Sequence, residues 1–358
     1  MKLKQVTIQN YKSCKETVID INDGITALIG INGAGKTNIL TAIDTLGEYY
    51  IDNTSNESEI TAIFYEGDLC IELKIIPADS YQLFYEWRMS DIIPDRWFTI
   101  PMRFHIYPDN ASENKTELKS LLHLQQINLS NDVFIDEIFT RSNKVKEFLK
   151  TIYYYSAALF ADPTKAAVSI NTTVTQRNPH DKFIFDLYQS KPETFERYTN
   201  LIGQHGIHLV DELKKGYTHG NIITPIIIHN NNELSFNQLS EGTFKTLALL
   251  FYLINSDDGL ILLEEPEICL HYKLLRDVIE IIKNESENKQ IIFSTHSDYV
   301  LDMLEPEVLV FVENTKDGTK ANALSKALSE NNYKGLRTFL ECEGSLGEYW
   351  KGGGFDGK

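Results

Sequence analysis

Short segments of alternating apolar and polar residues dominate the first 90 or so positions of this 358-residue chain. Turn residues such as Asn22-Asp23-Gly24 separate them, so each segment is typical of a strand with one face against a core. The predicted strands cover Met1–Ile8, Val18–Ile21, Glu59–Tyr65, Leu69–Ile76 and Tyr81–Trp87. We expect them to form an antiparallel β subdomain.

A second pattern consists of unbroken apolar runs, which are typical of strands buried on both faces of a parallel sheet. Such runs stand at Ile25–Ile29, Ile152–Ala158, Gly259–Leu263 and Gln290–Phe293. Segments compatible with helices lie between them, at Asn38–Ile43, Phe244–Asn255 and Ile268–Asn284. This alternation predicts an α/β fold with a mixed or parallel core sheet.

The middle of the chain has a different character. Helical spacing of apolar residues prevails from residue 91 to 151, for example in Glu117–Leu124 and Val133–Lys150, and again in Asp181–Gly216. An Asn-rich turn then joins Ile222–His229 to Glu233–Phe236 in a predicted hairpin. We therefore divide the chain into an N-terminal lobe with the β subdomain (1–90), a mainly helical insertion (91–220) and a C-terminal lobe (221–358).

The segment Gly30–Thr37 reads Gly-Ile-Asn-Gly-Ala-Gly-Lys-Thr and lies between a predicted strand and a predicted helix. This is the spacing and the context of a P-loop, in which backbone N–H groups surround phosphates, the lysine reaches the β- and γ-phosphates and the threonine hydroxyl ligates Mg²⁺. A Gly-rich turn that only joins a strand to a helix is the alternative. We predict ATP and Mg²⁺ as ligands, with nucleotide contacts from Gly30, Asn32, Gly33, Ala34, Gly35, Lys36, Thr37 and Asn38.

Two carboxylates, Glu264 and Glu265, end the apolar run that starts at Gly259. Neighbouring strand residues point to opposite faces, so we expect Glu264 to bind Mg²⁺, directly or through water, and Glu265 to polarise the attacking water. Acidic residues that start a helix are the alternative. His296 ends the next apolar strand and can hydrogen-bond a γ-phosphate oxygen. Strand ends of a doubly wound sheet meet at one site, where we expect all three side chains.

A second anion-binding element is predicted where Ser240 and Gly242 open the helix that continues to Asn255. Taken alone, Ser-x-Gly before a helix is also an ordinary N-cap.

Net charge limits the partners that this chain can bind. It carries 34 Lys+Arg and 51 Asp+Glu, a net charge of −17, so the average surface repels a nucleic-acid backbone and any such contact must be local. Arg141, Lys144 and Lys146 are candidates for a nucleic-acid or protein contact, with a solvated helix face as the plainer interpretation. Scattered cysteines and short apolar runs favour a cytoplasmic protein without a membrane span.

Taken together, these segments resemble the ABC-type ATPases of the RecF, SMC and OLD kind. The similarity covers about residues 1–80 and 220–315 and lies in the P-loop, Leu239–Thr243, Leu262–Glu267, Leu270-His271 and Ser294–Ser297. Ile8–Ser13 is also similar to the opening strand and turn of that family, and the resemblance extends the predicted nucleotide contacts to Lys12. The resemblance implies an ABC-ATPase head that forms a homodimer, or a higher oligomer, through an ATP sandwich completed by Ser240 and Gly242 of a second copy.

The tail Gly344–Trp350 and the insertion resemble prokaryotic AAA-family ATPases found beside nuclease or toprim-like effector genes in anti-phage systems. This implies an ATPase switch that regulates a separate effector. A RecF-type repair ATPase and a nucleotide-dependent scaffold with little turnover are the alternatives.

Two features depart from the pattern of the family. Glu264 replaces the usual Asp, which allows slow hydrolysis, and the glutamine loop has no clear place among Gln125, Gln126 and Gln176.

Overall fold

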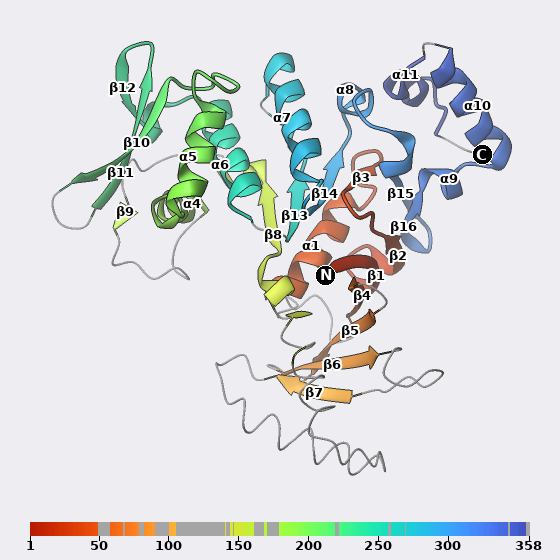
Figure 1. Ribbon diagram of the computed structural model, residues 1–358. Coiled ribbons are helices and arrows are strands. Elements are labelled where there is room, and N and C mark those ends of the chain that lie inside the picture. The colour runs from red at the N-terminus through yellow and green to blue at the C-terminus, as the bar shows by residue number, and fades with distance from the viewer. Residues whose placement is uncertain are drawn as a thin grey trace.

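Strands of a central sheet are flanked by helices, a second sheet and a smaller module of helices and strands (Figure 1). The computed structural model describes residues 1–48, 58–66, 69–78, 82–89, 100–104, 140, 144–145, 147–160, 168–169, 179–218, 222–256, 259–268, 270–342 and 344–355. Within these residues, no helix is long and apolar enough to cross a membrane.

The central sheet has the strand order β16-β15-β3-β14-β13-β8. Its strands are β3 (Ile25–Ile29), β8 (Tyr153–Ser156), β13 (Leu260–Glu264), β14 (Gln290–Thr295), β15 (Leu309–Thr315) and β16 (Gly318–Ala323). All neighbours pair in parallel except β16, which returns antiparallel to β15. Every residue of β3 and β14 is buried, as a strand covered on both faces requires. The predicted α/β fold with a mixed, mostly parallel sheet is confirmed.

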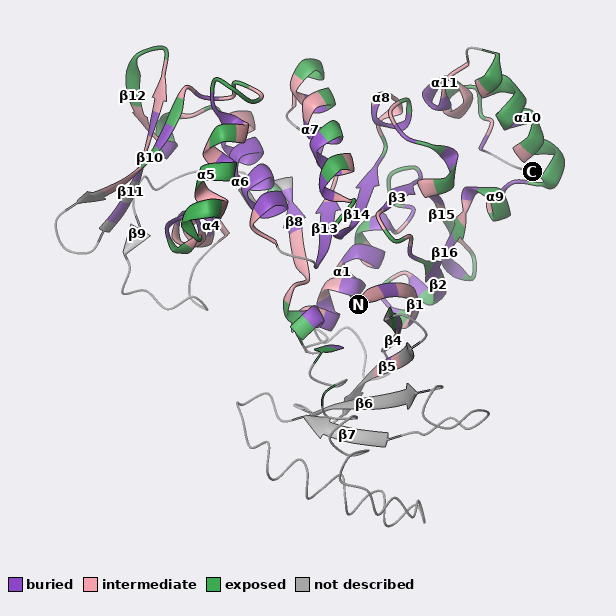
Figure 2. Cartoon of the chain, viewed as in Figure 1, coloured by how far each residue is buried: buried purple, intermediate pink, exposed green. Residues whose placement is uncertain are grey.

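The strands β13 and β14 are buried (Figure 2), and alternate residues of the central strands enter two separate cores, one on each face of the sheet. Ile261 and Leu263 pack in the core that includes α6 (Glu241–Asn255) and α7 (Tyr272–Glu285), whereas Leu260 and Leu262 pack in the core that includes α1 (Lys36–Glu48). This follows from the two-residue period of a strand. Glu264 continues the series of Leu260 and Leu262 and therefore reaches the start of α1.

The N-terminal β subdomain is an antiparallel sheet, as predicted, with the order β2-β1-β4-β5-β6-β7. It comprises β1 (Lys2–Tyr11), β2 (Cys14–Asp20), β4 (Glu59–Glu66), β5 (Leu69–Ala78), β6 (Gln82–Met89) and β7 (Ile100–Phe104). Leu3, Val6 and Ile8 of β1 are fully buried in the same core as α1, so this sheet is attached to the P-loop helix.

The module at the β8 edge combines α4 (Pro179–Gln189) and α5 (Pro192–Ile202) with a small antiparallel sheet. That sheet contains β9 (Val168–Ser169), β10 (Glu212–Thr218), β11 (Ile222–His229) and β12 (Asn232–Ser235). The predicted hairpin of β11 and β12 is confirmed, with Asn230 and Asn231 at positive φ in its turn. The prediction of helix as far as Gly216 is wrong, because Leu213 lies opposite Ile227 in a ladder that propensity alone does not reveal.

The C-terminal part adds short helices beyond β14 and the β15–β16 hairpin. These are α8 (Asp298–Leu301), α9 (Leu324–Ala327), α10 (Glu330–Glu341) and α11 (Leu346–Lys351). Phe355 is buried beside Trp350, with ring centroids 5.1 Å apart, and both rings face Phe311 of β15. The tail is therefore packed against β15 of the central sheet.

Several predictions concern residues outside the described part of the chain. These include helix Glu117–Leu124, the candidates Gln125, Gln126 and Gln176, Arg141 and Lys146. Of the predicted helix Val133–Lys150, residues 140, 144–145 and 147–150 are described and helical. The division at residues 90 and 220 stays a prediction.

Phe251 of α6 offers a test of the core. Its side chain is fully buried, and its ring lies 5.5 Å from that of Phe183 and 5.4 Å from that of Tyr198, measured between centroids. We expect Phe251→Ala to lower the free energy of unfolding by about 3–5 kcal/mol, because it leaves a cavity. Val18→Ala, at a side chain 44% exposed, should cost less than about 1 kcal/mol in the same denaturant titration. Equal losses would contradict this assignment of the core.

Candidate nucleotide-binding site

The loop between β3 and α1 has the backbone geometry of a phosphate nest. Gly33 and Gly35 adopt φ of 81° and 106°, values that suit glycine and turn successive N–H groups toward one centre. Gly35 is also constrained by space, because a Cβ there would lie 2.2 Å from Thr319 Oγ1. The loop leads directly into α1, so the nest and the N-terminus of the helix coincide.

Lys36 is held with its ammonium inside this loop. The side chain is 5% exposed, and Nζ donates to the carbonyl oxygens of Gly30 at 2.7 Å and Ile31 at 3.2 Å. Burial lowers the pKa of Lys36, and the charges of Glu265 and Glu267 oppose the shift. A buried cation at a phosphate nest is suited to an anionic ligand.

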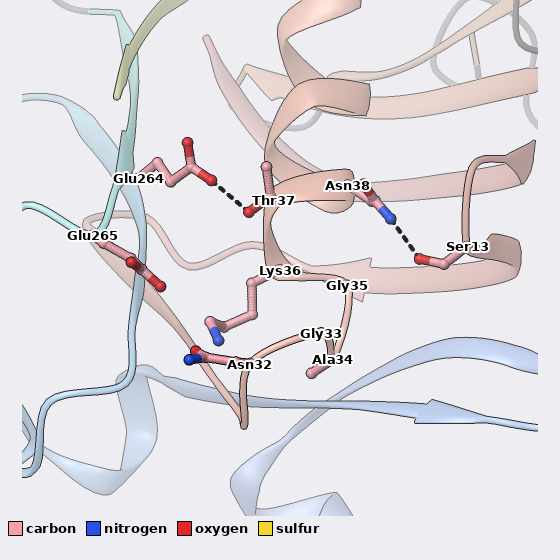
Figure 3. A pocket seen from close by; sticks show the side chains of 10 residues that line it. All are labelled: Ser13, Asn32, Gly33, Ala34, Gly35, Lys36, Thr37, Asn38, Glu264 and Glu265. Atoms are coloured by element: carbon pink, nitrogen blue, oxygen red, sulfur yellow. Dashed lines mark hydrogen bonds between the residues drawn. The ribbon is translucent and has the colours of Figure 1, made fainter. Parts of the chain in front are cut away.

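Thr37 and Glu264 join the start of α1 to the end of β13 (Figure 3). Thr37 Oγ1 donates to Glu264 Oε1 at 2.5 Å, and the hydroxyl of Tyr154 donates to Glu264 Oε2 at 2.6 Å. Burial would raise the pKa of Glu264, but these hydrogen bonds outweigh it, so the pKa lies below its usual value. A hydroxyl and an ionised carboxylate side by side are oxygen ligands of the kind that Mg²⁺ prefers, so the residues present fit this metal.

The other two carboxylates lie around His296. Nδ1 of His296 lies 3.0 Å from Oε1 of Glu265, and the backbone N–H of His296 donates to Glu267 Oε1 at 3.3 Å. Glu267 Oε1 also accepts from the Thr295 hydroxyl at 2.6 Å. Burial raises the pKa of Glu267, although both hydrogen bonds oppose this. These hydrogen bonds of Glu267 connect the loop after β13 to the end of β14, directly before His296.

Polar side chains from segments distant in the sequence form hydrogen bonds beside the P-loop and with its backbone. Thr319 Oγ1 of β16 lies 2.7 Å from Ser13 Oγ and 3.3 Å from the carbonyl oxygen of Ala34. Asn38 donates to Ser13 Oγ at 2.7 Å. The turn after β1, the first turn of α1 and the β15–β16 hairpin therefore fix the loop together.

Most of the predicted residues meet at one pocket of about 410 Å³, a volume within the range of ligand sites. It is lined by Ser13, Asn32, Gly33, Ala34, Gly35, Lys36, Thr37, Asn38, Glu264 and Glu265. Gly30 and His296 contact lining residues, and Lys12 donates to Thr41 of α1 at 3.1 Å. Ser240 and Gly242, both within the described residues, do not line it.

Ser240 instead caps an exposed helix end. Its Oγ accepts from the backbone N–H of Thr243 at 3.1 Å at the N-terminus of α6, and its side chain is exposed. The structure therefore places these residues at a helix start, as the sequence predicts, and separates them from the pocket of the same chain.

Sequence reasoning missed three groups at this site. Ser13 belongs to a segment that was recognised only for its similarity to a family, and Thr319 to a hairpin without a motif. Tyr154 lies in the predicted strand 152–158, of which Tyr153–Ser156 form β8 and Ala157 begins a 3-10 helix. Only the pairing of β8 with β13 shows that its hydroxyl reaches Glu264.

Comparison with known proteins agrees with this geometry. Residues 25–302 match the family described as "AAA domain, putative AbiEii toxin, Type IV TA system". The match covers more than half of the chain, so the chain belongs to this family and, as its motifs predict, to the ABC-type ATPases of the RecF/SMC class.

Two relatives show how local the sequence similarity is. The DNA replication and repair protein RecF of Staphylococcus carnosus is 40% identical over 60 residues, which is 17% of this chain and 16% of that protein. The DNA double-strand break repair Rad50 ATPase of Pyrococcus abyssi is 35% identical over 156 residues, 42% of this chain and 17% of that protein. The chain thus spans less than a fifth of the length of these relatives.

A solved structure extends the likeness to the fold. An SMC head bound to the C-winged helix domain of ScpA superposes with a TM-score of 0.51 at 16% identity, over 91% of this chain and 99% of that one. At this identity the likeness shows the fold alone.

Two glycines of the P-loop make a matched pair for mutation. A Cβ at Gly33 meets nothing within 4 Å, so Gly33→Ala should cost only the positive φ, on the order of 1–2 kcal/mol. Gly35→Ala should cost more, because it adds the clash with Thr319. Adding Thr319→Ala should restore part of this extra loss in denaturant unfolding. Equal free energies of unfolding for Gly33→Ala and Gly35→Ala would contradict the close packing of Thr319 against Gly35.

Proposed function

We propose that this protein is an ATP-hydrolysing switch that closes as a dimer around ATP and Mg²⁺ and regulates a separate effector. One observation carries the proposal. The Thr37 hydroxyl and the Glu264 carboxylate are in contact beside the phosphate nest and Lys36, within one pocket. This combination suits a nucleoside triphosphate with its divalent ion better than a lone anion.

Each side chain has a role in this proposal. Lys36 and the N–H groups of the nest bind and orient the β- and γ-phosphates. Thr37 and Glu264 hold Mg²⁺, which supplies charge neutralisation between the phosphates when bound. Glu265 orients the attacking water and accepts its proton. His296, adjacent to Glu265, hydrogen-bonds the γ-phosphate and so reports its presence.

The dimer is supported by the exposed start of α6. A 15-residue helix presents Ser240 and Gly242 at its N-terminus, away from the pocket of its own chain. Such an end favours an anion, and the γ-phosphate bound by a second copy satisfies it. Hydrolysis then removes the shared ligand and separates the subunits.

The separate effector rests on the resemblance of the tail Gly344–Trp350 and the insertion to ATPases found beside effector genes, and the family description names a putative toxin of a Type IV TA system. We place the protein in phage defence, with a nuclease or toprim-like partner. The net charge of −17 argues against extended contact with a nucleic-acid backbone, as the repair alternative requires. ATPase stimulation that grows with DNA length would favour repair instead.

Glu265→Gln tests the assignment of the general base. The change keeps the size of the side chain and one acceptor oxygen but removes its basicity, so ATP binding should persist while turnover falls about 10²-fold or more. Glu264→Gln is the matched control, and it should instead weaken the dependence on Mg²⁺. Single-turnover hydrolysis and nucleotide binding separate the two effects, and an exchange of phenotypes would reverse the roles.

A mixture of two inactive variants tests the shared site. Lys36→Ala should abolish tight ATP binding, whereas Gly242→Arg should bind ATP and block closure sterically. A mixed dimer contains one intact composite site and one site with both lesions, so ATPase activity should recover in part on mixing. Normal hydrolysis by Gly242→Arg alone would reject the shared-site mechanism. Normal ATP affinity of a folded Lys36→Ala protein would reject the nucleotide site itself.

A further inference from the structure

Tyr154 is joined to the proposed metal site although it comes from none of the recognised motifs. Its hydroxyl donates to Glu264 Oε2 at 2.6 Å, while Thr37 occupies Oε1 of the same carboxylate. Both carboxylate oxygens are therefore fixed, one from α1 and the other from β8. A carboxylate held at both oxygens has lost its torsional freedom before any ligand arrives.

The pairing of β8 with β13 fixes which tyrosine can do this. Tyr154 lies opposite Leu262 in the parallel ladder, and Tyr154 and Leu262 pack on the same core as α1. Tyr153 and Tyr155 point to the other face, where Tyr153 stacks on Tyr252 with ring centroids 3.9 Å apart. Among three consecutive tyrosines, only the middle one faces Glu264.

The chemistry of the phenol suits a permanent donor. A tyrosine hydroxyl is protonated at neutral pH, and at 2.6 Å it donates its hydrogen to the Glu264 carboxylate. Bonds of this kind to a ligating carboxylate orient it and tune its metal affinity.

We propose that Tyr154 is a positioning residue that sets the Mg²⁺ affinity of the nucleotide site by holding the Glu264 carboxylate against Thr37. Glu264 has one methylene more than the aspartate expected at this position, and hence one more rotatable bond. The bond from Tyr154 removes that freedom. The inference rests on the proposed function, since it concerns the same metal site.

The test measures nucleotide binding rather than turnover. A fluorescent ATP analogue is titrated with the full chain in EDTA and across a series of Mg²⁺ concentrations. Tyr154→Phe should leave binding in EDTA unchanged and should raise the Mg²⁺ concentration for half-maximal enhancement about 10- to 100-fold, the usual cost of losing such a partner. Tyr153→Phe removes a hydroxyl from the opposite face of the same strand and should not move the Mg²⁺ curve.

A double-mutant cycle with Glu264→Gln separates positioning from a general structural effect. If Tyr154 acts through Glu264, Tyr154→Phe should produce no further shift in the Glu264→Gln background, and thermal unfolding without nucleotide should confirm that all variants fold. An unshifted Mg²⁺ curve for Tyr154→Phe, or an equal shift in both backgrounds, overturns this inference and leaves the proposed function standing. A wild-type protein that binds no nucleotide with or without Mg²⁺ overturns both.

Discussion

Parallel pairing of β3, β14 and β13 is the constraint on which the site depends. The register places Ile29 opposite Thr295 and Ser294 opposite Glu264, so the P-loop, the carboxylates and His296 all begin at one edge of the sheet. A slip of β13 by one residue would turn Glu264 to the opposite face of the sheet, away from the start of α1. The two buried cores prevent this, because the same slip would also turn every leucine of β13 to the wrong core.

Electrostatics explains why the arrangement needs hydrogen-bond donors as well as a cation. Three carboxylates, Glu264, Glu265 and Glu267, gather around the buried cation of Lys36, and burial opposes the ionisation of Glu264 and Glu267. Glu264 stays ionised through donors on both oxygens, whereas Glu267 is buried and its pKa is raised. The Glu264 carboxylate is therefore suited to binding a metal, whereas the Glu267 carboxylate is suited to accepting the backbone N–H of His296.

Sequence patterns predicted those parts of the fold in which local and tertiary signals agree. Ile25–Ile29 and Gln290–Phe293 are apolar because both faces are covered, and their motifs stand directly after them. Residues 212–216 were predicted as helix but belong to β10, because their strand character depends on β11, with which they pair. Tyr154 escaped notice for the same reason, since a contact between strands 110 residues apart leaves no local pattern.

The turn at the end of β13 directs the side chains of Glu264, Glu265 and Glu267 to different partners. Glu265 has a φ of 44°. Residues other than glycine rarely adopt such a value, and those that do are often found at functional sites. Its N–H remains bonded to the Ser294 carbonyl oxygen at 3.1 Å, so the conformation is held by the neighbouring strand. Alternation stops there, which lets Glu265 meet His296 and Glu267 return to the end of β14. The proposed division between metal binding, proton transfer and support therefore follows from one backbone torsion that β14 stabilises.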